Sequence, residues 1–538
     1  MNTLWPMLRL RLGRDRVQLP IWIATFVALS LLAAVAVAES FGSNAERAAL
    51  VRIAVGSPTI LIFRGAPQGA DADAVTFFLI FAFLATLVAF MSTFLAVRHT
   101  RAEEESGRAE LIAATIAGRL TPLIATALHG VGASLAAGAA VALGFLAAGL
   151  DGVGSVTSGA AIAGTGIAFL AVGLLAGQLM RTSRGANGLA AALIGAAYAL
   201  RAAGDAGGTP SADGLSLTSA WPSWLSPIGW GQQTAAFTSA QPAPLLLDLA
   251  LAAVLFAVVV ALQSSRDIGS SVVGERSGRP RASRALGGSL GLAWRLQRSA
   301  IVGWALAGLA FGVLAGTLGE TVVELVESNS QIGAALAGVA GGRATIIDQF
   351  TAAIFSMIGV IAAAAATQAM IRMRQEEANG SAELLLALPL RRTRWILDYL
   401  VVGAAASVFV LAAAVGGAFG GLTRSAGTAD RVASVVASAV AQLPAALLIL
   451  AISALLFAVV PRFGIGLSWG VLLASVFIGQ FGELFGLPDW LRNLSPFTHT
   501  PAVGAADVDW SGAWWMLGLA LLFAALAAAA IRRRDLAL

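Results

Sequence analysis

The stretch RAEEESGRAEL at residues 101–111 decides the organisation of this chain, because a second version of it, RQEEANGSAEL, occupies residues 374–384. The two stretches share an arginine, paired glutamates, a glycine and an Ala-Glu-Leu ending at the same spacing. They are charged, whereas the whole chain is 58% hydrophobic and only 12% charged. A charged phrase that recurs in a hydrophobic chain indicates a tandem duplication with one copy in each half.

The hydrophobic composition places the chain in a membrane. Soluble domains carry about a quarter charged residues, and a helix needs about 20 apolar residues to cross a bilayer. We expect an all-α membrane protein, because an open sheet cannot satisfy its backbone hydrogen bonds in lipid. Twelve spans are predicted near residues 20–38, 75–97, 122–149, 159–180, 187–203, 244–263, 300–318, 350–371, 396–420, 433–459, 463–484 and 512–531.

The predicted spans form two parallel halves of six, related by an axis along the membrane normal. Each half opens with a basic amphipathic stretch, in which Arg16 and Trp22 are matched by Arg298 and Trp304. Each half also has Leu-Ser-Pro before its last span and a basic tail after it. The predicted segments are a first half at 1–267, a flexible Gly-, Ser- and Arg-rich linker at 268–291, and a second half at 292–538.

The arginines give an orientation. Most of the 34 basic residues, all of them arginine, fall in segments that the twelve spans place on one side, and Arg201 is among the few on the other. Cytoplasmic loops carry such an excess. We therefore expect both termini and both acid-rich phrases on the cytoplasmic side of a bacterial plasma membrane.

The acid-rich phrases predict a short exposed helix in each half. A turn dipeptide ending in Gly107 or Gly380 breaks the helix of the second span. The segment that follows is apolar apart from one glutamate, yet it faces the cytoplasm. Charge balance at the membrane surface is the simpler interpretation, but it does not account for the repeated spacing. We favour the interpretation that the two short helices dock into the grooves of a two-fold partner, with Leu111 and Leu384 as apolar anchors.

Two missing residue types limit the chemistry. The sequence contains no lysine, so it has no P-loop, and any ATP that drives it must bind another chain. It contains no cysteine, so it has neither disulfides nor thiolate metal sites. His99, His129 and His499 lie far apart in the sequence, and we expect no metal site from them. No group of side chains suited to catalysis is visible, because acids such as Asp205 are explained as solvated loop charges. We therefore expect that the chain is not an enzyme.

The order of these features resembles ABC-2 type permeases, the membrane halves of ABC exporters. The fused double form resembles the actinobacterial permeases that export polyketide antibiotics such as tetronasin. The resemblance covers the whole chain, once per half, and it implies that each acid-rich phrase is a coupling helix that sits on a separate ATPase. Pro389 fits the family, whereas Ile116 stands at the matching place in the first half. The coupling roles carried over fall on Glu103, Glu104, Gly107, Glu110, Leu111, Glu376, Glu377, Gly380, Glu383 and Leu384.

The resemblance also implies a complex of one such chain with two copies of a cytoplasmic ATPase that binds ATP and Mg²⁺. The implied cargo is a hydrophobic small molecule, not a nucleic acid. We expect the path between the halves, lined by spans two, three, five and their counterparts, with an aromatic seam on spans two and eight. For each of these side chains taken singly, helix packing or lipid contact is the favoured explanation. The seam comprises Phe83, Phe90, Phe94, Phe350, Phe355 and Met357.

A proton-coupled carrier similar to the major facilitators is the second interpretation. Such carriers also have twelve spans in parallel halves, but they use buried Asp, Glu or His side chains as proton relays. We identify no such residue in mid-membrane, so the exporter is favoured.

Overall fold

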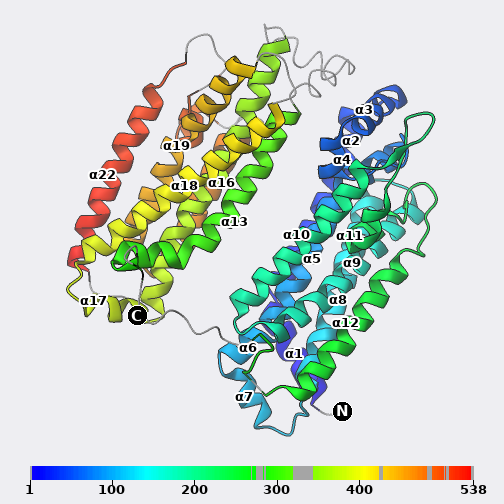
Figure 1. The fold of residues 1–538 in the computed structure, drawn as a ribbon, viewed down its shortest axis with the longest axis horizontal. Helices are drawn as coiled ribbons and strands as arrows, with labels where there is room; N and C mark the ends of the chain where they lie inside the picture. The colour runs from blue at the N-terminus through cyan, green and yellow to red at the C-terminus, as the bar shows by residue number, and fades with distance from the viewer. Residues whose placement is uncertain are drawn as a thin grey trace. The chain divides into compact units, whose positions relative to one another are not determined.

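The computed structural model describes two compact units (Figure 1). The described residues up to Val273 form unit one, and those from Ser283 on form unit two. The described residues are 3–267, 269–273, 283, 286–318, 343–422, 428–481, 488–501, 503 and 508–534.

Unit one is helical apart from a two-stranded antiparallel pair, in which Thr209 lies opposite Thr218. Its elements are α1 Leu4–Asp15, α2 Gln18–Ser40, α3 Asn44–Gly56, α4 Pro58–Arg64, α5 Ala72–Arg98, α6 Arg101–Glu105, α7 Arg108–Ala113, α8 Thr121–Ala147, α9 Gly152–Leu179, α10 Ser183–Ala206, β1 Thr209–Pro210, β2 Leu217–Thr218, η1 Trp221–Leu225, α11 Pro227–Gln232 and α12 Leu245–Ser265.

The described part of unit two is helical. Its elements are α13 Ser289–Thr317, α16 Arg343–Ala378, α17 Ser381–Leu386, α18 Arg392–Leu422, α19 Thr428–Val459, α20 Gly464–Phe481, α21 Asp489–Arg492, η3 Pro496–His499 and α22 Ser511–Arg533.

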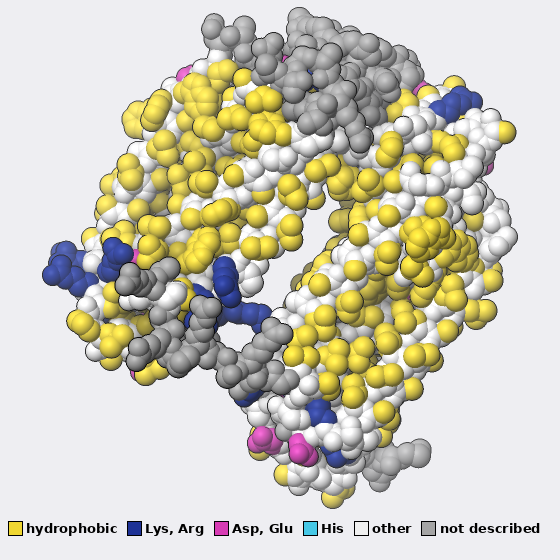
Figure 2. All heavy atoms as spheres, viewed as in Figure 1, with side chains coloured by type: hydrophobic (Ala, Val, Ile, Leu, Met, Phe, Trp, Pro, Cys, Tyr) yellow, Lys and Arg dark blue, Asp and Glu magenta, His cyan; other side chains and the backbone are white. Residues whose placement is uncertain are grey.

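Among the described residues, eleven helices are long and apolar enough to cross a membrane. Each corresponds to a predicted span, which confirms an all-α membrane protein. The remaining predicted span corresponds to α20, whose apolar stretch 464–479 is shorter, and its predicted end at 482–484 lies outside the described residues. Hydrophobic side chains cover the long sides of the helices (Figure 2), as lipid-facing surfaces require.

The same helix pairs pack within both units. In unit one α2 packs on α8, α5 on α9, and α12 on α9. In unit two α13 packs on α18, α16 on α19, and α22 on α19. Close backbone approach accompanies this packing, because a Cβ on Gly312 of α13 would stand 1.9 Å from the carbonyl oxygen of Ala414. The repeated pairing is what a duplicated six-helix architecture requires.

The units differ at the basic stretch with which each begins. In unit one the chain breaks after Asp15 and α2 starts at Gln18. Pro20 accounts for the break, because proline lacks an N–H and its ring clashes with the carbonyl four residues earlier. In the register set by Arg16 and Arg298, Val302 takes the place of Pro20. Helix α13 accordingly runs without interruption.

Part of the predicted linker is held against unit one. The backbone N–H groups of Val272 and Val273 donate to the carbonyl groups of Gln178 and Leu179, at 3.4 and 3.1 Å. The start of the segment therefore packs on the end of α9.

Candidate functional site

Each unit carries the short helix that the acid-rich phrase predicts. Helix α7 follows Gly107 and helix α17 follows Gly380, and both glycines adopt φ of 73°. This left-handed conformation favours glycine. No described atom lies within 4 Å of the position that a Cβ would take at either glycine. The backbone turn, not crowding, therefore accounts for glycine at both sites.

The outer faces of these helices are bare within their units. Leu111 is 72% exposed and Leu384 is 78% exposed. The neighbouring Glu110 and Glu383 are exposed as well. An apolar side chain beside a carboxylate on a protruding helix is what a helix-in-groove contact needs.

In unit one the second glutamate of the phrase fastens the acid-rich segment 101–111 to the last helix of the unit. Glu104 accepts hydrogen bonds on both carboxylate oxygens from Arg266, at 2.6 and 3.1 Å, just after α12. Arg101 adds a third, at 2.7 Å. The side chains of Glu104 and Arg266 are 9% and 6% exposed. This bidentate, nearly buried pair is a strong contact.

Unit two repeats the arrangement. Glu377 pairs with Arg534, just after α22, and with Arg374 at 3.4 Å. Arg374 in turn donates from Nε to the carbonyl of Pro461 at 2.9 Å. Arg101 does the same to Gly177 at 2.8 Å.

Sequence analysis missed Arg266 and Arg534, the arginines that pair with Glu104 and Glu377. These two ion pairs are named the glutamate clamps. The signal was present, since each half ends in a basic tail, SRDIG at 265–269 and RRDLA at 533–537. The sequence does not show that Arg266 and Arg534 each lie against a glutamate of their own half.

The first glutamate of the phrase has different partners in the two units. Glu103 pairs with Arg14 of α1 and lies 3.9 Å from Arg11. Glu376 lies 3.6 Å from Arg372 on its own helix. The first glutamate therefore ties the acid-rich segment to the N-terminal helix in unit one, whereas in unit two it forms its ion pair within its own helix.

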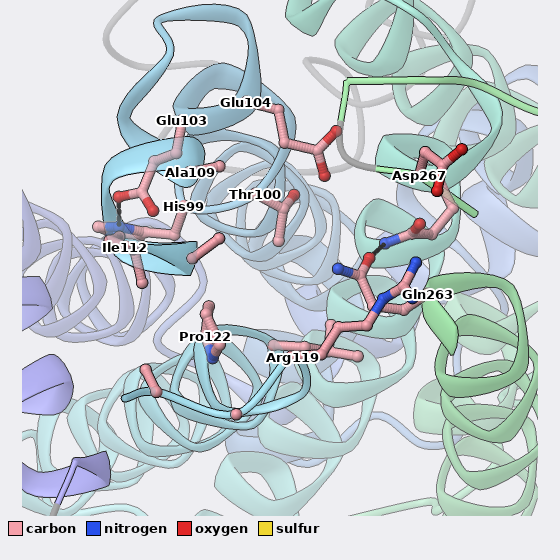
Figure 3. A pocket seen from close by; sticks show the side chains of 15 residues that line it. His99, Thr100, Glu103, Glu104, Ala109, Ile112, Arg119, Pro122, Gln263 and Asp267 are labelled. Carbon is pink, nitrogen blue, oxygen red and sulfur yellow. Dashed lines mark hydrogen bonds and ion pairs between the residues drawn. The ribbon is translucent and has the colours of Figure 1, made fainter. Parts of the chain in front are cut away.

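A pocket of about 390 Å³ lies beneath α7 (Figure 3). Its lining combines Ile112 of α7 with polar groups of other elements, among them Arg119 and Gln263. Beneath α17 a pocket of about 400 Å³ is lined mainly by apolar residues, including Leu385 and Pro389. The short helix α7 therefore stands over a pocket, whereas α17 borders a pocket but buries its Ala382 in the core of unit two.

The histidines depart from expectation. His99 and His129 meet at Asp15, with ring centroids 5.4 Å apart. Only His499, in unit two, lies apart from them, and it contacts the carbonyl of Asn493 at 2.9 Å. Sequence separation misled here, because α1 and the ends of α5 and α8 converge. Burial raises the pKa of Asp15, but hydrogen bonds from His129 and His99 outweigh it and hold that pKa below its usual range.

Two acids also correct the sequence analysis. Asp205, expected to be a solvated loop charge, is fully buried and bonds Arg201, Ser219 and Gln232 at 3.1, 2.6 and 3.0 Å. Asp248 was overlooked within the span 244–263. It is fully buried, and neither of its oxygens has a hydrogen-bond partner among the described residues.

The aromatic seam divides into exposed and buried members. Phe83 is 50% exposed and Phe94 is 39% exposed, with the ring of Phe90 5.5 Å from that of Phe94. Met357 is 52% exposed, whereas Phe355 is fully buried in the core of unit two. Phe350, also of unit two, is partly buried.

Comparisons with known proteins agree with this architecture. A family model described as the C-terminal domain of the multidrug efflux system permease Rv1217c matches residues 286–532. The multidrug efflux system permease protein Rv1217c of Mycobacterium tuberculosis is 36% identical to this chain over 533 residues. The match covers 98% of this chain and 94% of the relative, so both units are included.

Proposed function

The chain belongs to the family of the multidrug efflux permease Rv1217c, and from that premise we propose that it is the membrane subunit of an ATP-driven exporter of the ABC-2 type. A multi-pass membrane permease without a P-loop needs an ATPase partner to be driven by ATP. The proposal assigns that role to two copies of a cytoplasmic ATPase, which bind ATP and Mg²⁺.

The observation that carries the proposal is the pair of bare short helices. Both α7 and α17 present a leucine more than 70% exposed, behind a glycine with φ of 73°. A repeated apolar anchor with nothing on it in its own unit fits a partner with two equivalent grooves. In this proposal the helices and both termini face the cytoplasm, in agreement with the arginine bias.

The glutamate clamps supply a route for force. When ATP closes the partner dimer, the partner moves α7 and α17. The short helices pull on the segments that precede them, where Glu104 of α6 holds Arg266 after α12 and Glu377 of α16 holds Arg534 after α22. Movement of the short helices thus becomes movement of the last membrane helix of each unit, which opens the path outward.

For the cargo we propose hydrophobic drugs and antibiotics, including polyketide-like compounds. The relative's description as a multidrug efflux permease supports the class. Exposed aromatic side chains such as Phe83 and Phe94 suit apolar cargo, since apolar and aromatic residues line most small-molecule sites.

A proton-coupled carrier remains the second candidate, and Asp248 is the observation in its favour. An ionisable side chain buried in an apolar span is a functional candidate by default. Asp248 lies in the first turn of α12, however, and not in mid-helix. The exporter therefore has the stronger support.

The test is co-purification of an ATPase with the tagged full-length chain from its native membrane. We expect a stoichiometric ATPase with the natural chain and loss of it from the variant Leu111→Asp with Leu384→Asp, because a carboxylate opposes burial in an apolar groove. Leu494→Asp is the matched control. Leu494 is also exposed, at 66%, but it comes after the end of α20 and is not part of α7 or α17.

A lone chain that transports solute down a proton gradient without ATP contradicts the proposal and favours the carrier. Equal ATPase recovery with the double variant shows instead that the partner docks elsewhere.

A further inference from the structure

Three buried side chains meet beneath the acid-rich segment of unit one. Asp15 ends α1, His99 follows α5 and His129 lies in α8, and they are 4%, 1% and 5% exposed. Oδ2 of Asp15 lies 2.7 Å from Nε2 of His99 and 2.8 Å from Nε2 of His129. Their ligand-type atoms all lie within 4.8 Å of one another.

We propose that Asp15, His99 and His129 form a binding site for a divalent transition metal, with Zn²⁺ the preferred ion. Two imidazole nitrogens and one carboxylate oxygen are a common ligand set for zinc, which leaves a fourth position to water. The exporter role assigns nothing to these three residues, so the site does not depend on it.

The spacing fits the metal-free form of such a site. Zinc bonds of 2.0–2.2 Å in tetrahedral geometry place ligand atoms roughly 3.3 Å apart. The present separations of 2.7 and 2.8 Å are hydrogen-bond distances, so a proton occupies each gap. An opening of about half an ångström per pair admits the metal, and each neutral histidine that binds it through Nε2 then carries its proton on Nδ1.

The surroundings orient the ligands. The other carboxylate oxygen of Asp15 lies 3.0 Å from Arg98. The carbonyl of His99 accepts from Arg11 at 3.0 Å. Nδ1 of His99 is buried and has no hydrogen-bond partner among the described residues, while Glu103 Oε1 stands 3.9 Å away. A shift of about 1 Å makes that contact the carboxylate–histidine–zinc arrangement that accompanies most histidine ligands.

The local charge limits the affinity. Arg11, Arg14 and Arg98 surround the cluster, and the carboxylates of Asp15 and Glu103 offset only part of that charge. A divalent cation is repelled by the remainder. We therefore expect a dissociation constant on the order of 1 μM, weaker than that of a structural zinc finger.

An entry path exists on the side of His99. This residue lines the pocket of about 390 Å³ beneath α7 (Figure 3). A bound ion would join α1 to α5 and α8 at the base of the acid-rich segment. Unit two has Gln297, Arg372 and Val402 at the matching positions, and this set cannot hold the ion. The site is therefore specific to unit one.

The composition makes the test clean. The chain has no cysteine and only three histidines, so few other side chains retain zinc. The full-length chain in detergent is incubated with ZnCl₂, freed of excess metal and analysed for zinc by mass spectrometry. The variant His99→Gln with His129→Gln keeps amide N–H donors toward Asp15 but removes both imidazoles. His499→Gln is the matched control.

We expect about one zinc ion per chain in the natural protein and in the control, and almost none in the double variant. Zinc should raise the Tm of the first two by a few degrees and leave that of the double variant unchanged. Equal zinc content and equal Tm in all three overturn the proposal and leave a hydrogen-bonded junction only. If the double variant does not fold, Co²⁺ absorption by the natural chain decides, since a tetrahedral protein site absorbs far more strongly than the hydrated octahedral ion.

Discussion

The two units build the same acid-rich segment in different ways. In unit one the chain breaks between α5 and α6, at His99 and Thr100, whereas in unit two α16 runs unbroken to Ala378. No proline causes the break. Arg11 donates to the carbonyl of His99 at 3.0 Å and to that of Pro122 at 2.7 Å. The guanidinium thus takes a carbonyl that a continuous helix would use itself.

The matching residue in unit two is Ala293, which has no group to compete for that carbonyl. One arginine in α1 therefore accounts for a bent segment in one unit and a straight one in the other. The glutamate clamps, in contrast, are common to both units. The comparison indicates that the clamps serve the shared task, whereas the junction of α1 with α5 and α8 is particular to unit one.

The largest expected effect concerns the exposed faces of α7 and α17, which both units have in common. Glu110→Ala together with Glu383→Ala should lower drug-stimulated ATP hydrolysis and efflux at least tenfold, because each glutamate fixes the register of its helix in a groove. Both side chains are exposed, so folding and membrane insertion should be unchanged. Efflux from vesicles that contain the complex measures this, and the single variants show whether the two helices contribute equally. Unaltered efflux in the double variant would remove the register role.

The clamps come next. Arg266→Ala and Arg534→Ala should each destabilise the protein by roughly 3 kcal/mol, because a nearly buried carboxylate loses one of its two arginine partners. Thermal unfolding in detergent measures the loss. Arg533→Ala is the control, since Arg533 is exposed beside Arg534. A large loss in one unit alone would show that the clamps are not equivalent.

The sequence predicted the helices, the repeat and the glycine breaks well, because each depends on local composition or spacing. Eleven of the predicted spans match membrane-length helices. It failed where contacts join distant segments. Asp15 and His129 are 114 residues apart yet 2.8 Å from each other, and no periodicity encodes such a meeting. Asp205 looked solvated because its partners, Ser219 and Gln232, lie beyond its own helix.

A smaller effect is expected at the break between α5 and α6. Arg11→Ala should destabilise the protein by about 1.5–3 kcal/mol, the range for a hydrogen bond from a charged donor. It should also change amide exchange at Glu103, whose N–H donates to the carbonyl of Thr100 at 3.0 Å and can then move to the carbonyl of His99, as in a continuous helix. Hydrogen exchange with mass spectrometry measures the change, with the exposed Arg9 replaced by alanine as the control. If exchange at Glu103 is unchanged, Arg11 does not cause the bend.

The smallest effect separates the two candidate functions. In the register of Arg266 and Arg534, Met516 of α22 occupies the place of Asp248 in α12, and both are buried. Asp248→Met gives unit one the residue of unit two. It should stabilise the protein by about 1 kcal/mol, because a buried carboxyl without a partner is removed, and ATP-driven efflux should be unchanged.

A proton-coupled carrier predicts the opposite for the same variant. If Asp248 relays protons, its replacement by methionine abolishes transport while the fold becomes more stable, and Asp248→Asn does the same with almost no change of shape. Measuring Tm and efflux together therefore distinguishes a buried acid that has no role in transport from one that relays protons. Since α22 functions in the same protein with methionine at this position, we expect α12 to do so as well.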